Sequence, residues 1–185
     1  MKKVFLIVAI LLCCVFDARA QQQIGNDEYE VYSAWLKKGF LIPKQTEISI
    51  VNVTEDFWND LSTLPREKRQ KLSRLRSSTL ENYRLRNRKP LEFKNDFVPG
   101  LIVNLISRED WLNHPARRTS DQVPEHMDNR LIFSRVGFNK KRNQALIHVH
   151  FNSNPSPKYA FGYFFVLSND NGVWDVKQAV KSWEY

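Results

Sequence analysis

The stretch YAFGYFFVLSNDNGVWDVKQAV, from Tyr159 to Val180, decides the fold of this chain. Its first part, YAFGYFFVL, is apolar at almost every position, which is typical of a strand that is covered on both faces. Asn171 and Gly172 then give the strongest short signal for a β-hairpin, since both tolerate the positive φ of a two-residue turn. The segments on either side, Tyr159 to Leu167 and Val173 to about Val180, are therefore predicted to be antiparallel strands.

Two further strands precede this hairpin. They run from Leu131 to Phe138 and from Gln144 to Asn152, on either side of the polar turn NKKRN. Short turns join antiparallel neighbours, so the four strands are predicted to form a meander. Farther upstream, β-branched residues predict strands from Glu47 to Val53 and from Leu101 to Ile106.

Helical patterns are confined to the first half of the chain. Apolar residues in the segment 31–36 share one helical face, and Asp27 with Glu30 fits a capping box at the start of that helix. A basic helix is predicted over residues 65–86. The polar stretch 107–130 has no sustained period and is compatible with a loop, short helical turns or a flap. The sequence thus predicts an α+β fold, with N-terminal helices packed on a mostly antiparallel sheet that ends in the four-strand meander.

Residues 1–20, MKKVFLIVAILLCCVFDARA, have the three parts of a secretory signal peptide. A positive start is followed by a short apolar run and by the cleavage signature Ala18-Arg19-Ala20. The apolar run is too short to cross a bilayer. Both cysteines, Cys13 and Cys14, lie in this segment. The mature chain, 21–185, is therefore predicted to be a single soluble domain without disulfides or a membrane span, secreted or periplasmic.

The positive charge of the chain is concentrated in one segment. The formal net charge is +8, and removal of residues 1–20 takes away three basic residues and one acidic residue, which leaves +6. Residues 66–89 contain ten Lys or Arg and two Glu, so this segment alone carries +8. The rest of the mature chain is close to neutral or slightly acidic.

The basic helix is the strongest indication of function in the sequence. Its positive field would attract phosphate-rich or carboxylate-rich partners. The candidate anion-binding residues are Arg74, Arg76, Arg84 and Arg86. The expected partner is an anionic glycan, a lipid headgroup or another polyanion, and nucleic acid is disfavoured for an exported chain. The alternative is a solvated helix face, whose arginine stems cover a narrow apolar seam.

His148 and His150 lie two residues apart on a predicted strand, so both side chains leave the same face of the sheet. The intervening residues form the opposite face, which is apolar and predicted to belong to the core. Shared metal binding would need further donors, and His114 and His126 in the stretch 107–130 are the candidates. Partly exposed histidines on the polar face of a strand are the more common case, so no cofactor is predicted.

Ser134 is the candidate nucleophile. If Asn139 pairs with Asn143 across the turn, Ser134 lies opposite His148 on the same face, which would place a hydroxyl beside a base. A shift of one residue would bring an apolar side chain there instead. No Gly-x-Ser-x-Gly motif accompanies Ser134. A serine hydrogen-bonded to a neighbouring strand is favoured, and a catalytic Ser134–His148 pair is the alternative.

The C-terminal third resembles a group of exported bacterial proteins that are catalogued mostly as uncharacterised. The matching stretches are FSRVGFN (133–139), QALIHV (144–149), GYFFVL (162–167), NGVWDV (171–176) and Trp183. The resemblance covers the N-terminal helices only in outline. It implies an exported α+β domain and brings no activity with it.

These patterns together favour an exported, non-enzymatic binding or interaction domain of unassigned role, which contacts an anionic partner through the basic helix. The alternative from another class is a small hydrolase or metal-dependent enzyme centred on Ser134, His148 and His150. A third possibility is a ligand pocket between helices and a curved sheet, as in nuclear-transport-factor-like folds.

Overall fold

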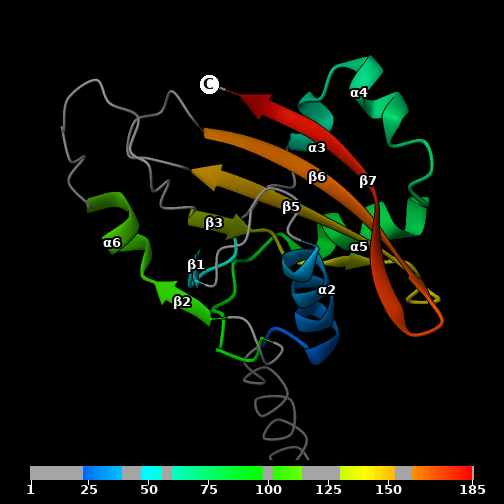
Figure 1. Cartoon of the computed structure of the whole chain (residues 1–185). Helices are drawn as coiled ribbons and strands as arrows, with labels where there is room; N and C mark the ends of the chain where they lie inside the picture. The colour runs from blue at the N-terminus through cyan, green and yellow to red at the C-terminus, as the bar shows by residue number, and fades with distance from the viewer. Residues whose placement is uncertain are drawn as a thin grey trace, which may run out of the picture.

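A computed structural model describes residues 23–38, 47–55, 60–97, 102–113, 130–152 and 160–184 (Figure 1). Its helices are α2 (Asn26–Lys37), α3 (Asp60–Thr63), α4 (Arg66–Lys71), α5 (Ser77–Arg86) and α6 (Arg108–Asn113). Its strands are β1 (Glu47–Val51), β2 (Ile102–Ile106), β3 (Arg130–Phe133), β4 (Gly137–Phe138), β5 (Gln144–Asn152), β6 (Ala160–Asp170) and β7 (Val173–Glu184). The predicted signal peptide lies outside the described residues. In the part of the chain that the structure describes, no helix has the length and apolarity needed to cross a membrane.

The strands form one mixed sheet in the order β2-β1-β3-β5-β6-β7, with β4 paired to β5. The pairs β1–β2 and β1–β3 are parallel, and all the others are antiparallel. The prediction of an α+β fold with a mostly antiparallel sheet is confirmed. Asn171 and Gly172 form the turn between β6 and β7, and both have the positive φ that the sequence predicted, 57° and 83°.

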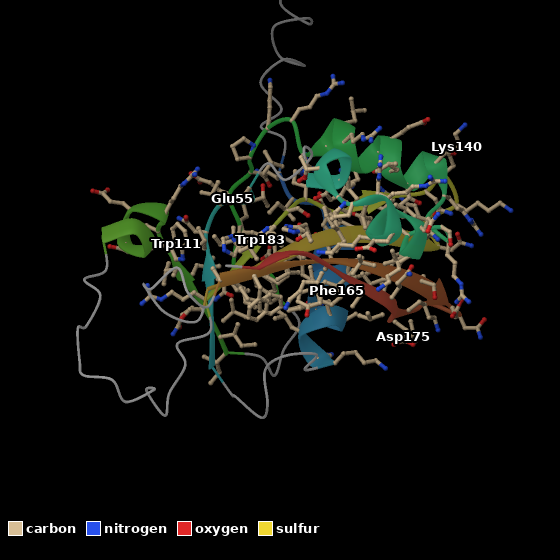
Figure 2. All side chains as sticks on the ribbon, turned by 90° about the horizontal axis from the view of Figure 1, so that it is seen from above. Glu55, Trp111, Lys140, Phe165, Asp175 and Trp183 are labelled. Carbon is tan, nitrogen blue, oxygen red and sulfur yellow. The ribbon has the colours of Figure 1, made fainter. Side chains whose placement is uncertain are left out.

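Helices cover both faces of the sheet. Figure 2 shows α2, in blue, on one side and the green helices α3–α5 on the other. Successive residues of β5 face opposite layers. Ile147 packs in the cluster that contains Trp35 of α2, and Leu146 packs in the cluster that contains Tyr83 of α5. The strand face that contains Ile147 is core, as predicted. The opposite face is also buried, because His148 has no exposed surface, so the expectation of partly exposed histidines there is wrong at this position.

The predicted basic helix is divided into α4 and α5 by a turn at residues 72–76. Sheet side chains bond the backbone groups that this break leaves free. Gln178 of β7 donates to the carbonyl of Lys71, and Gln144 of β5 accepts from the N–H of Arg76 and donates to the carbonyl of Arg74. The prediction of a capping box at the first helix is also wrong. Gly25 is the N-cap of α2, without a side-chain hydrogen bond, and Asp27 lies in the first turn.

The predicted strand from Leu131 to Phe138 is interrupted by a β-bulge at residues 134–136. Between Phe133 and Gly137 the chain advances four residues, while the paired residues of β5, Val149 and Leu146, are three apart. Side chains from both helical layers bond the backbone of the bulge. Tyr32 and Glu28 of α2 bond the carbonyl of Ser134 and the N–H of Val136, and Asn87, which follows α5, bonds both backbone groups of Arg135.

Helix α5 covers the free edge of β4. Asn82 accepts a hydrogen bond of 2.9 Å from the N–H of Phe138, so the edge has a partner and cannot pair with another strand. Gly137 permits this close approach, because a Cβ added there would lie 2.5 Å from the Cα of Tyr83 in α5.

We therefore expect Gly137→Ala to lower the free energy of unfolding by about 1–3 kcal/mol, since α5 must shift to make room. Urea denaturation measures the change. Gly25→Ala is the control, because its added Cβ meets only the flexible carboxylate of Asp27. At this N-cap position the loss should be no more than about 1 kcal/mol. Equal losses in the two variants would mean that α5 moves without cost.

Candidate functional site

A solvent-open hollow lies between α5 and the turn that joins β4 to β5. Its volume is about 680 Å³. Its basic lining residues are Arg84, Arg86, Arg88, Lys140 and Arg142, and Glu81 is its one acidic lining residue. We call this the first hollow. Figure 2 shows Lys140 on the side of the sheet where α3–α5 lie, at the end opposite Trp111.

The basic residues of the first hollow fall into two groups. Arg86 and Arg142 have acid partners in α2: Arg86 binds Glu28 at 2.8 Å and Arg142 binds Asp27 at 2.7 Å. Arg84, Arg88 and Lys140 are exposed, and none of them has an ion pair with another described residue. The hollow therefore combines two guanidinium groups that are held in place with three charges that remain available to a ligand.

Phe138 holds the two anchored guanidinium groups close to each other. The guanidinium carbon of Arg86 lies 5.5 Å from the centre of the Phe138 ring, and that of Arg142 lies 5.2 Å from it. Cations at such distances are attracted to the negative face of an aromatic ring. Each arginine is thus restrained by a carboxylate and by a ring, which reduces the freedom it would lose on binding a ligand. The restraint is stronger for Arg86, whose carboxylate partner is buried, than for Arg142, whose side chain is 61% exposed.

The turn that carries Lys140 and Arg142 is fixed by asparagine side chains. Asn139 accepts hydrogen bonds from the N–H groups of Asn143 and Gln144, and its amide donates to Asn143 at 2.7 Å. Arg142 has a φ of 53°, a conformation that costs a non-glycine residue about 1 kcal/mol or more. The hydrogen bonds around Asn139 offset this cost, so the cations of the turn project from a defined backbone.

A buried carboxylate lies behind the first hollow. Glu28 has no exposed surface, and one of its oxygens accepts from both Arg86 and Arg135 at 2.8 Å. The other oxygen accepts from the N–H of Val136 at 3.1 Å. Two guanidinium groups and one carboxylate leave one positive charge over, and Arg86 carries part of it to the surface of the hollow.

The structure separates the four arginines that the sequence proposed for anion binding. Arg84 and Arg86 line the first hollow, and Arg74 and Arg76 do not. The guanidinium of Arg76 donates to Asn143 at 3.1 Å instead. Sequence reasoning missed Lys140 and Arg142 as site residues. The basic run NKKRN was visible between two predicted strands, but only the docking of α5 beside β4 brings it to the helix.

Ser134 lies opposite His148, but the turn does not close with Asn139 paired to Asn143 as that prediction required. The N–H of Asn139 donates to the carbonyl of Gln144, and the bulge at 134–136 shifts the register by one residue to bring Ser134 opposite His148. The two side chains do not form a nucleophile–base pair. The Ser134 hydroxyl accepts from the backbone N–H of His148 at 2.8 Å and donates to the carbonyl of Arg135 at 3.1 Å. Ser134 is fully buried. Its hydroxyl therefore supports the bulge.

The imidazole of His148 bonds a different serine. Its Nε2 lies 2.8 Å from the hydroxyl oxygen of Ser182 in β7. Burial, and secondarily the neighbouring His150, lower the pKa of His148 to about 3. A base with so low a pKa accepts protons poorly at neutral pH. The pKa of His148 therefore lies too far below neutral for the general-base step that acyl transfer requires. Little in the sequence indicated that Ser182 lies beside His148, because the position of Ser182 in the sheet depends on two register shifts between β6 and β7.

His150 packs among aromatic rings. Its ring centre lies 4.6 Å from that of Trp183 and 6.3 Å from that of Trp111, both at steep angles, and burial lowers its pKa to about 4. The other two candidate metal ligands, His114 and His126, lie outside the described residues. Within the described ranges, no group of three or more His, Cys, Asp or Glu side chains is placed to hold a metal ion.

The fold and the first hollow define an α+β domain with a solvent-open cationic site. Comparisons of the chain with protein-family models, with curated proteins and with solved structures gave no match. The resemblance to exported bacterial proteins therefore stays a prediction.

Proposed function

We propose that this chain is an exported, non-enzymatic binding domain that holds an anionic ligand in the first hollow. The observation that carries the proposal is the gathering of Arg84, Arg88 and Lys140, which have no ion pair among the described residues, around two anchored guanidinium groups. Charges that only solvate a helix do not need to lie beside the charges of a second element around one concave surface. Like charges gathered in such a hollow raise the local positive potential, which attracts anions.

The arrangement suits an anion better than a neutral ligand. Arginine side chains from α5 and from the β4–β5 turn face one space, so a phosphate, sulfate or carboxylate there can accept hydrogen bonds from both elements. Because Arg86 and Arg142 are already held by Glu28, Asp27 and Phe138, a ligand orders few side chains on binding. The available charges are exposed, so binding should weaken as salt screens them.

Retention of the purified protein on a sulfated resin, eluted with increasing salt, tests the proposal. The triple variant Arg84→Ser, Arg88→Ser, Lys140→Ser is expected to elute at much lower salt than the wild type. The matched control is Arg66→Ser, Arg69→Ser, Arg74→Ser, which removes the same charge from exposed positions outside the hollow. The control should lower the elution point only slightly, since it changes the net charge and leaves the hollow intact.

Two results would overturn the proposal. Equal losses of retention in the two triple variants would mean that net charge alone attracts the resin. A wild-type protein that elutes at low salt, together with the hollow variant, would mean that the hollow binds no anion.

A further inference from the structure

A second hollow adjoins the first one along α5. It has a volume of about 540 Å³ and is lined by Gln23, Leu85, Arg86, Arg88, Lys89 and Arg135. Leu85, Arg86 and Arg88 belong to both hollows, so the two are adjacent sections of one depression. We call the two hollows together the basic trough.

The basic trough is longer than a single anionic group. Its lining residues from Ser78 to Arg88 follow one side of α5 and the turn after it, at spacings of three or four residues. At a rise of about 1.5 Å per residue, the eight steps from Ser78 to the end of α5 at Arg86 correspond to roughly 12 Å, and Arg88 lies beyond the helix. A lone phosphate or sulfate would contact only one section, whereas a chain-like ligand could place anionic groups in both.

The lining of the basic trough combines charged, neutral polar and apolar side chains. Leu85 is 59% exposed and lies where the two hollows meet, and it is the apolar surface of the trough, because Phe138 also lines it but is only 4% exposed. Neutral hydrogen-bonding side chains lie among them, and they are Gln23, Ser78 and Asn82. Asn139 also lines the trough, but it is buried and its amide is bonded within the turn. Glu81 adds a carboxylate, which repels an anionic group and accepts hydrogen bonds from hydroxyl groups.

On the basis of the proposed function, we infer that the ligand of the basic trough is an anionic polysaccharide. In such a chain, charged groups alternate with neutral sugar rings that carry hydroxyl groups and apolar C–H faces. The charged groups meet the arginines and lysines, the hydroxyls meet Glu81 and the amides, and a ring face packs on Leu85. A polyphosphate chain carries a charge at every unit. Some of its charges would therefore lie beside the carboxylate of Glu81 or the apolar side chain of Leu85, and both contacts are unfavourable.

Calorimetric titration with chains of different chemistry tests this inference. The probes are sulfated and uronate oligosaccharides from disaccharide to octasaccharide, polyphosphate of matched total charge, and inorganic sulfate. We expect oligosaccharide affinity to rise with length and to level off once the chain spans both hollows. At equal total charge the oligosaccharide should bind more tightly than polyphosphate, and inorganic sulfate should bind weakly.

Two variants separate the sugar contacts from the charge. Leu85→Ser should weaken oligosaccharide binding several-fold and leave polyphosphate binding unchanged, and it should not disturb folding because Leu85 is exposed. Glu81→Ala should weaken oligosaccharide binding, since a lost charged hydrogen bond costs more than the screened repulsion it removes, and should strengthen polyphosphate binding.

Failure of this inference can be told apart from failure of the proposed function. Polyphosphate that binds as tightly as the oligosaccharides, or identical effects of both variants on the two ligands, would overturn the polysaccharide and leave the anion site in place. Vesicles of anionic lipid are titrated in the same way, and preferential binding to them would do the same. Absence of binding to every anionic probe would overturn both.

Discussion

Replacement of Glu28 by alanine is expected to lower the free energy of unfolding by about 3–5 kcal/mol. The carboxylate is fully buried, and Arg135, one of its two guanidinium partners, has only 6% of its side chain exposed. Without Glu28, Arg135 would be a buried charge with no acid partner among the described residues, and the N–H of Val136 would lose its acceptor. Breaking a buried ion pair from one side is costly for this reason.

Urea denaturation at neutral pH measures this loss. Glu30→Ala is the matched control, since Glu30 is exposed on the same helix, and its effect should stay within about 0.5 kcal/mol. The double variant Glu28→Ala, Arg135→Met should regain part of the stability, because it removes the charge left without its partner. Similar losses for Glu28→Ala and Glu30→Ala would contradict the role assigned to the buried carboxylate.

The second large effect is an acid-induced loss of stability that depends on His148 and His150. Burial lowers the pKa of His148 from 6.5 to about 3 and that of His150 to about 4, so both rings are neutral in the folded protein at pH 5–6. The unfolded chain binds these protons below about pH 6.5. Their contribution is therefore fully present above pH 6.5 and is lost as the pH falls towards 4 and then 3. Each histidine should contribute a slope of about 1.4 kcal/mol per pH unit within this window.

Urea denaturation between pH 7.5 and pH 5 is the measurement, since most carboxylates remain ionised there. His148→Gln should remove about half of the slope, and the double variant His148→Gln, His150→Gln should remove nearly all of it. Glutamine can still donate to the Ser182 hydroxyl, so the variants test titration more than packing. An unchanged slope in the double variant would show that other groups cause the acid sensitivity.

The hairpin residues and the alternation of β5 made much of the sheet predictable. Asn171 and Gly172 have local conformations that few other residues adopt, and Ile147 lies on the apolar face that its sequence neighbours defined. The break in the basic helix could not be predicted, because it depends on Gln144 and Gln178, which reach α4 and α5 from distant strands. No glycine or proline in the basic helix after Pro65 marks the position of the break.

The candidate site was predictable in charge and not in shape. Arg84 and Arg86 were proposed from the charge of residues 66–89. Lys140 and Arg142 complete the first hollow only because α5 lies against β4, where Gly137 leaves room for it. The acid partners of Arg86 and Arg142 come from a helix more than fifty residues away. Such contacts are set by tertiary packing, which periodicity and spacing do not record.

The bulge at residues 134–136 also bears on how the chain folds. Its hydrogen bonds to Tyr32 and Glu28 join residues that are 102 and 108 positions apart in the sequence. Closing a loop of that length costs chain entropy before the contact can stabilise the fold, and folds dominated by such contacts form slowly. Helix α2 can form these contacts only after the last third of the chain is present, so the folding transition state should contain α2 and the bulge at once.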